Sequence, residues 1–369
     1  MRRKKTIAII IIILALVLIM NPRSLEYFNT KLVNSKSDMV ILKEIELPHS
    51  SQIAYEKFNN GVLQYWDGIL YFHDMSGQQI WTLHLGVINP ILKTSGNSIY
   101  VVDNNKKQIT RVSKDGELVY KSIIERNIYD FSVNNSEYVL LHQIQENTPY
   151  RYLLLLNGEG KKTNEIVLSD VEIMKAKVDS SNQILIHTIS TVNNKIENNL
   201  QQYDIKGKLL SLDSLEDKLL LDFYYESRGN LILVFEDGIK AVDKNKGIKW
   251  ETKTEPIKII HKQIGEYIAL YNSDSKKSGI VYGKSPEKLK VINEGGSTLS
   301  ESILKERPIG IDSNKNEIIY YSNRSLYIGN KKGEWTTEYK YNSDIEKAFI
   351  YPQKYVIVIT KERLTFLKF

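Results

Sequence analysis

The sequence contains no cysteine among its 369 residues. This absence excludes disulfide bonds, thiolate metal sites, a cysteine nucleophile and a lipid-modified N-terminal cysteine. Proline is scarce as well, with 8 residues, and glycine has 20. Since 42% of the residues are hydrophobic, the composition indicates a folded chain with a substantial core, built from short strands and polar turns.

Outside its N-terminus the chain lacks an excess of charge of one sign. Its formal charge is +6, but seven Lys or Arg and two acids before Met39 account for +5 of it. The remaining residues are nearly neutral, which is a poor electrostatic match for a polyanion. We therefore expect no nucleic acid among the partners.

Only one long apolar run is present, at residues 7–20, directly after the basic cluster Arg2-Arg3-Lys4-Lys5. This is the layout of a secretory signal or a signal anchor. The positive-inside rule keeps the basic end in the cytoplasm. Because no small-x-small cleavage site follows the run, the sequence favours an uncleaved transmembrane anchor, with a cleaved signal peptide as the alternative.

The domain organisation follows from this segment. Residues 1–5 are predicted to be a cytoplasmic tail, residues 6–21 a single transmembrane helix, and residues 22–38 a polar stalk. From residue 39 onward, short runs of Val, Ile, Leu, Tyr and Phe are broken by Gly, Asn, Asp and Lys. This pattern predicts one all-β domain over residues 39–369. The predicted anchor would hold this domain on the extracellular side of the cell membrane.

The strand breaks are periodic. Tight turns containing glycine follow an apolar strand at Gly77, Gly116, Gly160, Gly207, Gly247 and Gly333, which lie 39, 44, 47, 40 and 86 residues apart. The last gap spans two repeats, and a turn without glycine is expected near its middle, at residues 285–288. A period near 43 is typical of the four-stranded blades of a β-propeller.

The two ends of the chain predict how such a ring closes. The last segment, residues 346–369, supplies three strands and lacks an outer one, whereas the strand at residues 39–47 has no turn partner of its own. This N-terminal strand can complete the last blade. The sequence therefore predicts eight four-stranded blades, with seven as the alternative.

One repeat reads Ala241-Val242-Asp243 through Gly247 to Trp250, and Trp81 and Trp335 follow the glycine turns of two others. The pattern resembles the repeat of pyrroloquinoline-quinone-type (PQQ-like, WD40-like) propellers. It is also similar to membrane-anchored propellers of unknown function from low-GC Gram-positive bacteria. The resemblance implies the fold and no activity. Quinone-dependent members use a vicinal disulfide, so a chain without cysteine is expected to bind neither pyrroloquinoline quinone nor another cofactor.

Side chains that can support chemistry are scattered. The six histidines have no metal-ligand spacing and are interpreted as packed or half-exposed strand residues; they are His49, His73, His84, His142, His187 and His261. The tryptophans are interpreted as packing between blades. In each of the pairs Tyr224-Tyr225 and Tyr320-Tyr321 one ring is expected to be exposed, because adjacent strand residues face opposite sides.

Two hypotheses of function remain. The first is a non-catalytic scaffold that binds another protein of the cell envelope, because the sequence contains no catalytic motif and no metal-binding or cofactor-binding site. The alternative is an envelope hydrolase or lyase, or a glycan-binding propeller. A hydrolase or lyase would need carboxylates that converge at the inner strands, and Asp130, Asp222 and Glu306 are the candidates by position.

Overall fold

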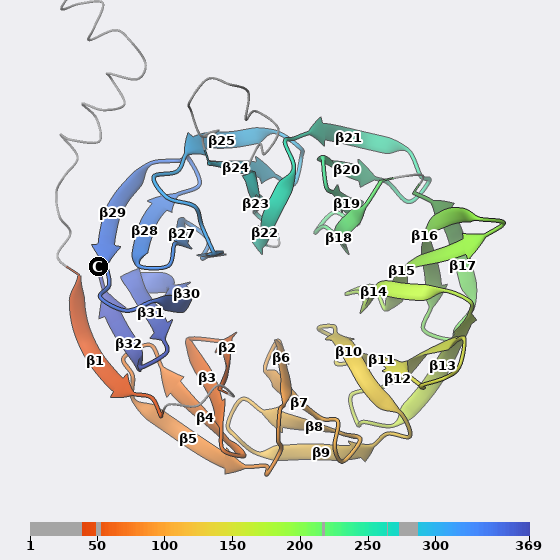
Figure 1. The fold of residues 1–369 in the computed structure, drawn as a ribbon, viewed down its shortest axis with the longest axis horizontal. Helices are drawn as coiled ribbons and strands as arrows, with labels where there is room; N and C mark the ends of the chain where they lie inside the picture. Colours follow the sequence, from red (N-terminus) through yellow and green to blue (C-terminus); the bar gives the residue numbers. More distant parts are fainter. Residues whose placement is uncertain (1–38, 49–52, 216–217, 264, 273–286) are drawn as a thin grey trace, which may run out of the picture.

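A computed structural model describes residues 39–48, 53–215, 218–263, 265–272 and 287–369. Eight four-stranded antiparallel sheets are arranged around a central axis (Figure 1). Apart from the short 3₁₀ helix η1 (Pro352–Lys354), the elements in these ranges are strands. The predicted all-β propeller with eight blades is confirmed.

The first strand of each blade lies nearest the axis (Figure 1). These inner strands are β2 (Ala54–Phe58), β6 (Ile91–Ser95), β10 (Asn127–Val133), β14 (Glu172–Val178), β18 (Leu220–Tyr225), β22 (Ile257–Gln263), β26 (Gly310–Ser313) and β30 (Ile345–Tyr351). The second strands are β3 (Gly61–Trp66), β7 (Ser98–Asp103), β11 (Val139–Ile144), β15 (Gln183–Val192), β19 (Leu231–Phe235), β23 (Tyr267–Asn272), β27 (Glu317–Tyr321) and β31 (Tyr355–Thr360).

The third and fourth strands complete each sheet toward the rim. The third strands are β4 (Ile69–Asp74), β8 (Gln108–Ser113), β12 (Tyr150–Leu156), β16 (Lys195–Asp204), β20 (Gly238–Val242), β24 (Lys288–Asn293), β28 (Ser325–Asn330) and β32 (Arg363–Lys368). The outer strands are β5 (Gln79–His84), β9 (Leu118–Ile123), β13 (Lys162–Ser169), β17 (Leu209–Ser214), β21 (Ile248–Lys253), β25 (Thr298–Ile303), β29 (Trp335–Lys340) and β1 (Val40–Glu46). Blades 1 to 8 are numbered from β2–β5 through β26–β29 to β30–β31–β32–β1.

The outer strand of blade 8 comes from the other end of the chain. β1 pairs antiparallel with β32, and Glu44 lies opposite Thr365 in the ladder. This is the arrangement that the sequence predicts for residues 39–47. Because the first and last strands of the domain share one sheet, the ring is joined by backbone hydrogen bonds.

The burial pattern explains why the strands differ in sequence. β7 (SIYVVD) is buried at every position, since both faces of its blade pack against a neighbour. β5 (QIWTLH) alternates between exposed and half-buried residues, as expected at the rim. The described residues contain eight hydrophobic clusters, one at each interface between neighbouring blades. Burial between blades therefore stabilises the ring.

The repeat turn of blade 6, between β24 and β25, lies at Asn293–Gly296 and contains glycine. It is therefore not the turn predicted at residues 285–288, of which Ser285 and Pro286 lie outside the described ranges. The predicted anchor at residues 6–21 lies outside the described ranges. Within those ranges no helix has the length and apolar character needed to cross a bilayer.

Candidate functional site

Among the described residues, seven tight turns join the third and outer strands of blades 1 to 7. Each turn begins with Asp, Ser or Asn. In the first, Asp74 Oδ1 accepts the backbone N–H groups of Ser76 (2.8 Å) and Gln78 (2.9 Å). The N–H of the fourth turn residue donates to the carbonyl of the first, and this fourth residue has a positive φ. The fourth residues are Gly77, Gly116, Gly160, Gly207, Lys246, Gly296 and Gly333.

At the six glycines, the turn packs directly against the preceding blade; we call such an interface sealed. A Cβ built on Gly116 of blade 2 would lie 2.7 Å from Cδ2 of Trp81 on β5, the outer strand of blade 1. The other five meet the preceding blade in the same way. Since φ at Gly116 is +82°, a side chain there would be strained as well as obstructed.

Two tryptophans complete these seals. Trp81 Nε1 donates to the carbonyl of Lys114 in the next turn (3.0 Å), and Trp250 Nε1 does the same to Glu294 (3.1 Å). The indoles therefore lie beneath Gly116 and Gly296 of the following blade. The interpretation of tryptophan as packing between blades is confirmed at these positions.

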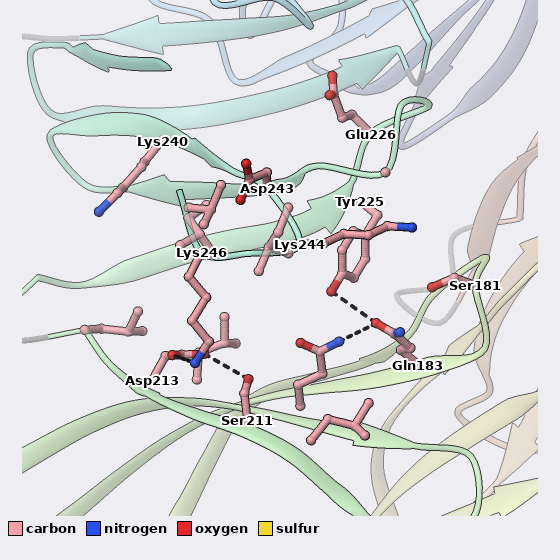
Figure 2. A pocket seen from close by; sticks show the side chains of 18 of the residues that line it. Ser181, Gln183, Ser211, Asp213, Tyr225, Glu226, Lys240, Asp243, Lys244 and Lys246 are labelled. Atoms are coloured by element: carbon pink, nitrogen blue, oxygen red, sulfur yellow. Dashed lines mark hydrogen bonds and ion pairs between the residues drawn. The ribbon is translucent and has the colours of Figure 1, made fainter. Parts of the chain in front are cut away.

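Blade 5 is the exception. Its turn reads Asp243-Lys244-Asn245-Lys246, so lysine occupies the fourth position, with φ of 65°. The repeat glycine assigned from the sequence, Gly247, comes one residue later, and the three atoms nearest to a Cβ built on it all belong to Asp243 of its own turn. A lysine cannot approach blade 4 as closely as glycine. Lys246 instead extends across the gap to an ion pair with Asp213 on β17 (Figure 2).

A cleft of about 710 Å³ lies between blades 4 and 5 at this turn. One wall comes from β15, β16 and β17, and the other from the end of β18, from β19 and β20, and from the turn of blade 5. The apolar lining is formed by Leu200, Leu210, Leu215, Leu231, Leu233, Phe235 and Val242. This size and mixture of apolar and polar lining are typical of binding clefts.

Polar groups line the same cleft (Figure 2). Gln183 Oε1 accepts hydrogen bonds from the Tyr225 hydroxyl (3.2 Å) and from Gln202. Burial raises the pKa of Tyr225 to about 12, so this hydroxyl remains a donor at neutral pH. Lys240 and Lys244 also line the cleft, and neither has an acidic partner within ion-pair distance among the described residues. Glu226 lines the cleft too and has no basic partner within ion-pair distance among these residues. The cleft thus combines an apolar floor with two unpaired lysines and one unpaired carboxylate.

Two of the predicted carboxylates lie on inner strands. Asp130 on β10 pairs with Lys93 of blade 2 (2.5 Å). Asp222 on β18 pairs with Lys177 (2.5 Å), Lys175 (2.8 Å) and Lys262 (2.5 Å). Burial alone would raise the pKa of Asp222, but the surrounding ammonium groups outweigh it and hold that pKa well below its usual range. Asp222 is therefore a permanent anion rather than a proton donor.

The third carboxylate does not join them. Glu306 lies in the loop between β25 and β26, where it accepts hydrogen bonds from the hydroxyls of Ser322 and Ser325 (3.1 Å to Ser325). Asp130, Asp222 and Glu306 are thus held by three separate sets of partners. In the part of the chain that the structure describes, no three His, Asp or Glu side chains are grouped closely enough to hold a metal ion.

The histidines and tyrosines are more buried than exposed. His73, His142 and His187 are buried, and His261 is partly buried against Ser313 (2.7 Å from Nε2 to Oγ). His84 is exposed, and His49 lies outside the described residues. The prediction of one exposed ring in each tyrosine pair is wrong. Tyr320 and Tyr321 are both buried by neighbouring blades, and Tyr224 and Tyr225 are both half-buried.

The cleft is not among the sites predicted from the sequence, although the sequence contains a signal for it. Lysine at the fourth turn position distinguishes blade 5 from the other six turns. Because Gly247 directly follows Lys246, the spacing between the glycines of the repeat stays nearly regular, and this spacing alone does not reveal the lysine at the fourth position.

Solved structures resemble the whole ring. The Dos1 propeller shares 11% identity with a TM-score of 0.60, covering 91% of this chain and 97% of that one. BamB from Moraxella catarrhalis shares 10% identity with a TM-score of 0.56, covering 90% and 100%. A streptogramin B lyase shares 13% identity with a TM-score of 0.51, covering 89% and 97%. At these identities the likeness shows a PQQ-like or WD40-like propeller fold alone.

At the level of sequence, no curated protein matches the chain. One family profile matches residues 33–369, and its description is "Family of unknown function (DUF5711)". The match includes the entire propeller. The chain therefore belongs to the DUF5711 family.

Proposed function

We propose that this protein is a membrane-anchored, extracytoplasmic scaffold whose propeller binds a segment of another cell-envelope protein in the cleft between blades 4 and 5. The observation that carries the proposal is the turn of blade 5, which among the seven described turns is the one with lysine in place of glycine at the fourth position and which lies beside an amphipathic cleft. The anchor is supported by the basic cluster and apolar run at the N-terminus.

The chemistry of the cleft indicates what its occupant should be. Seven apolar side chains line the cleft, and Leu210, Leu231 and Val242 among them are accessible enough to receive the apolar side chains of an extended segment. Lys240 and Lys244 favour an acidic residue on the same segment. An extended, amphipathic and acidic peptide region of a partner protein therefore fits better than a neutral one.

The alternative is an envelope hydrolase or lyase, or a glycan-binding propeller. The lyase among the similar structures belongs to a different protein and shares only the fold with this chain. The three candidate carboxylates have separate partners, so these three do not converge as an acid and a base. An acid and a histidine do lie close together elsewhere on the inner strands, where His261 Nε2 is 4.0 Å from Asp312 Oδ1 and is hydrogen-bonded to Ser313.

Two leucines on β17 provide a matched test. Leu210 lines the cleft, whereas Leu212 does not, and both are exposed by about half, 47% and 57%. The full-length chain and its Leu210→Asp and Leu212→Asp variants would be used as baits after mild crosslinking in cells. Because a buried anchor contact contributes about 1–2 kcal/mol or more, we expect Leu210→Asp to lose roughly tenfold of a specific envelope protein.

The Leu212→Asp bait should recover that protein at the level of the unaltered chain. Equal recovery by the two variants would place the partner elsewhere and overturn the proposed cleft. Retention of a glycan without any protein, independent of Leu210, would instead favour the alternative function.

A further inference from the structure

A second feature, independent of the cleft, lies on the inner strands of blades 4 to 6. The lysine cluster consists of Lys175 and Lys177 on β14 and Lys262 on β22. All three reach one carboxylate, Asp222 on the intervening strand β18. Lysines from blades 4 and 6 therefore converge across the inner edge of blade 5.

The charges in this cluster do not balance. Elsewhere on the inner strands, one lysine pairs with one acid, as Lys93 does with Asp130 and Lys57 with Asp312. When all three ammonium groups around Asp222 are protonated, they share a single carboxylate, which leaves an excess of two positive charges. Like charges held this close repel one another strongly when partly removed from water.

The ammonium groups also retain unused donors. Lys177 donates to Asp222 and to the carbonyl of Phe223 (3.0 Å), and Lys262 donates to Asp222. Lys175 contacts Asp222 and donates to the carbonyl of Leu221 (3.3 Å). Since each ammonium group has three N–H donors, some have no protein acceptor among the described residues. Solvent still reaches these side chains, with 24%, 38% and 25% of Lys177, Lys175 and Lys262 exposed.

We propose that the lysine cluster and Asp222 form a binding site for a small divalent anion on the inner surface of the ring. A tetrahedral oxyanion or a short dicarboxylate supplies the two missing negative charges and several acceptor oxygens. Asp222 holds the three ammonium groups together and so preorganises the site. The proposal does not depend on the cleft, because the two sites have no lining residue in common.

The titration of Lys177 agrees with this arrangement. Burial, together with the positive charges of Lys262 and Lys175, lowers its pKa to about 7, although Asp222 acts in the opposite direction. The groups that face the cluster are Asp222 from β18, Lys262 from β22, and His187 of β15 beside Lys175. An anion that needs charged Lys177 should therefore bind more weakly as the pH rises through 7.

Sulfate is a suitable first probe because its charge stays constant around this pH; inorganic phosphate and succinate are further arms. Calorimetric titration of the purified full-length chain should give a Kd below about 1 mM for at least one of them. Lys177→Met or Lys262→Met should weaken binding by about ten- to a hundredfold, as expected for loss of a charged hydrogen bond. Lys177→Arg should retain most of the affinity.

Lys93→Met is the matched control, because Lys93 belongs to a balanced pair on another part of the inner surface. It should leave anion binding unchanged. Denaturation midpoints of all variants would establish that each is folded. Absence of binding by all three probes would overturn the proposal, as would binding that both methionine variants leave unchanged.

Discussion

Blade 2 and blade 5 are both four-stranded sheets, but they differ at the outer rim of the ring and at its central axis. At the rim, the turn of blade 2 places Gly116 on Trp81 of the preceding blade, whereas the turn of blade 5 presents Lys246 to Asp213 across an open cleft. At the axis, Lys93 beside blade 2 has its own acid, whereas three lysines around blade 5 share Asp222. The repeat thus maintains the fold, and departures from it mark candidate binding sites.

The largest difference is expected when the inner carboxylates are removed. Asp222→Asn removes the counter-charge that Lys175, Lys177 and Lys262 share in a largely buried position. This should cost up to about 3–5 kcal/mol of unfolding free energy, less whatever Lys177 recovers by losing its proton. Asp130→Asn removes one exposed pair, with 51% of the Asp130 side chain accessible, and should cost less than about 1 kcal/mol. Urea denaturation of both variants at neutral pH tests this. Similar losses would mean that the two pairs are equivalent.

The next effect concerns the turns. Gly116→Ala introduces a Cβ 2.7 Å from Trp81 at a positive φ, so we expect a loss of about 2–4 kcal/mol. Lys246→Ala removes only a partly exposed ion pair with Asp213 and should cost no more than about 1 kcal/mol. The midpoints of denaturation provide the measurement. If Gly116→Ala is tolerated as well as Lys246→Ala, the distinction between sealed and open interfaces is wrong.

The free energy of unfolding should also depend on pH through Lys177, which contacts Asp222 of blade 5. The folded pKa of Lys177 is lowered to about 7 from an ordinary value of 10.5. Between these values the unfolded chain binds more protons at this site, so stability should rise with pH across this range. Allowing for solvent screening, the contribution is about 1–2 kcal/mol.

Lys177→Met should flatten this rise, whereas Lys93→Met should not. Denaturation midpoints measured across the range decide the matter. An unchanged slope in Lys177→Met would show that Lys177 titrates at an ordinary pKa.

The smallest effect on unfolding free energy is expected when glycine is restored at the fourth turn position of blade 5. Lys246→Gly removes the strain of a side chain at φ of 65° and also removes the ion pair with Asp213. These changes oppose each other, and we expect a net gain of at most about 1 kcal/mol. Thermal unfolding would measure it. A clear loss of stability would mean that the ion pair closes the ring at this interface.

Local sequence patterns predict most of the fold. Alternating apolar residues and tight polar turns indicate four-stranded blades. An unpaired N-terminal strand, together with a last blade that lacks its outer strand, indicates how the ring is joined. The sequence places the repeat turn of blade 6 at residues 285–288, because Ser and Pro favour turns. In the structure this turn joins β24 and β25 at Asn293–Gly296.

The sites were harder to predict, since their geometry depends on contacts between blades. Lys177 and Lys262 are 85 residues apart in sequence, yet the ring brings both to Asp222. No spacing rule identifies such a group, because its members come from three blades. The cleft has a local signal at Lys246, but that signal is recognisable only when the fourth position of every turn is aligned by its hydrogen bonds.

The central claim, that the open interface between blades 4 and 5 is the partner site, can be tested with a photo-crosslinking residue. Lys244 and Lys114 occupy the second position of equivalent turns, one beside the cleft and the other in a sealed interface. With the probe in the full-length chain in cells, we predict a specific adduct with an envelope protein from position 244 and none from position 114. Equal adducts from both positions, or none from position 244, would contradict the claim.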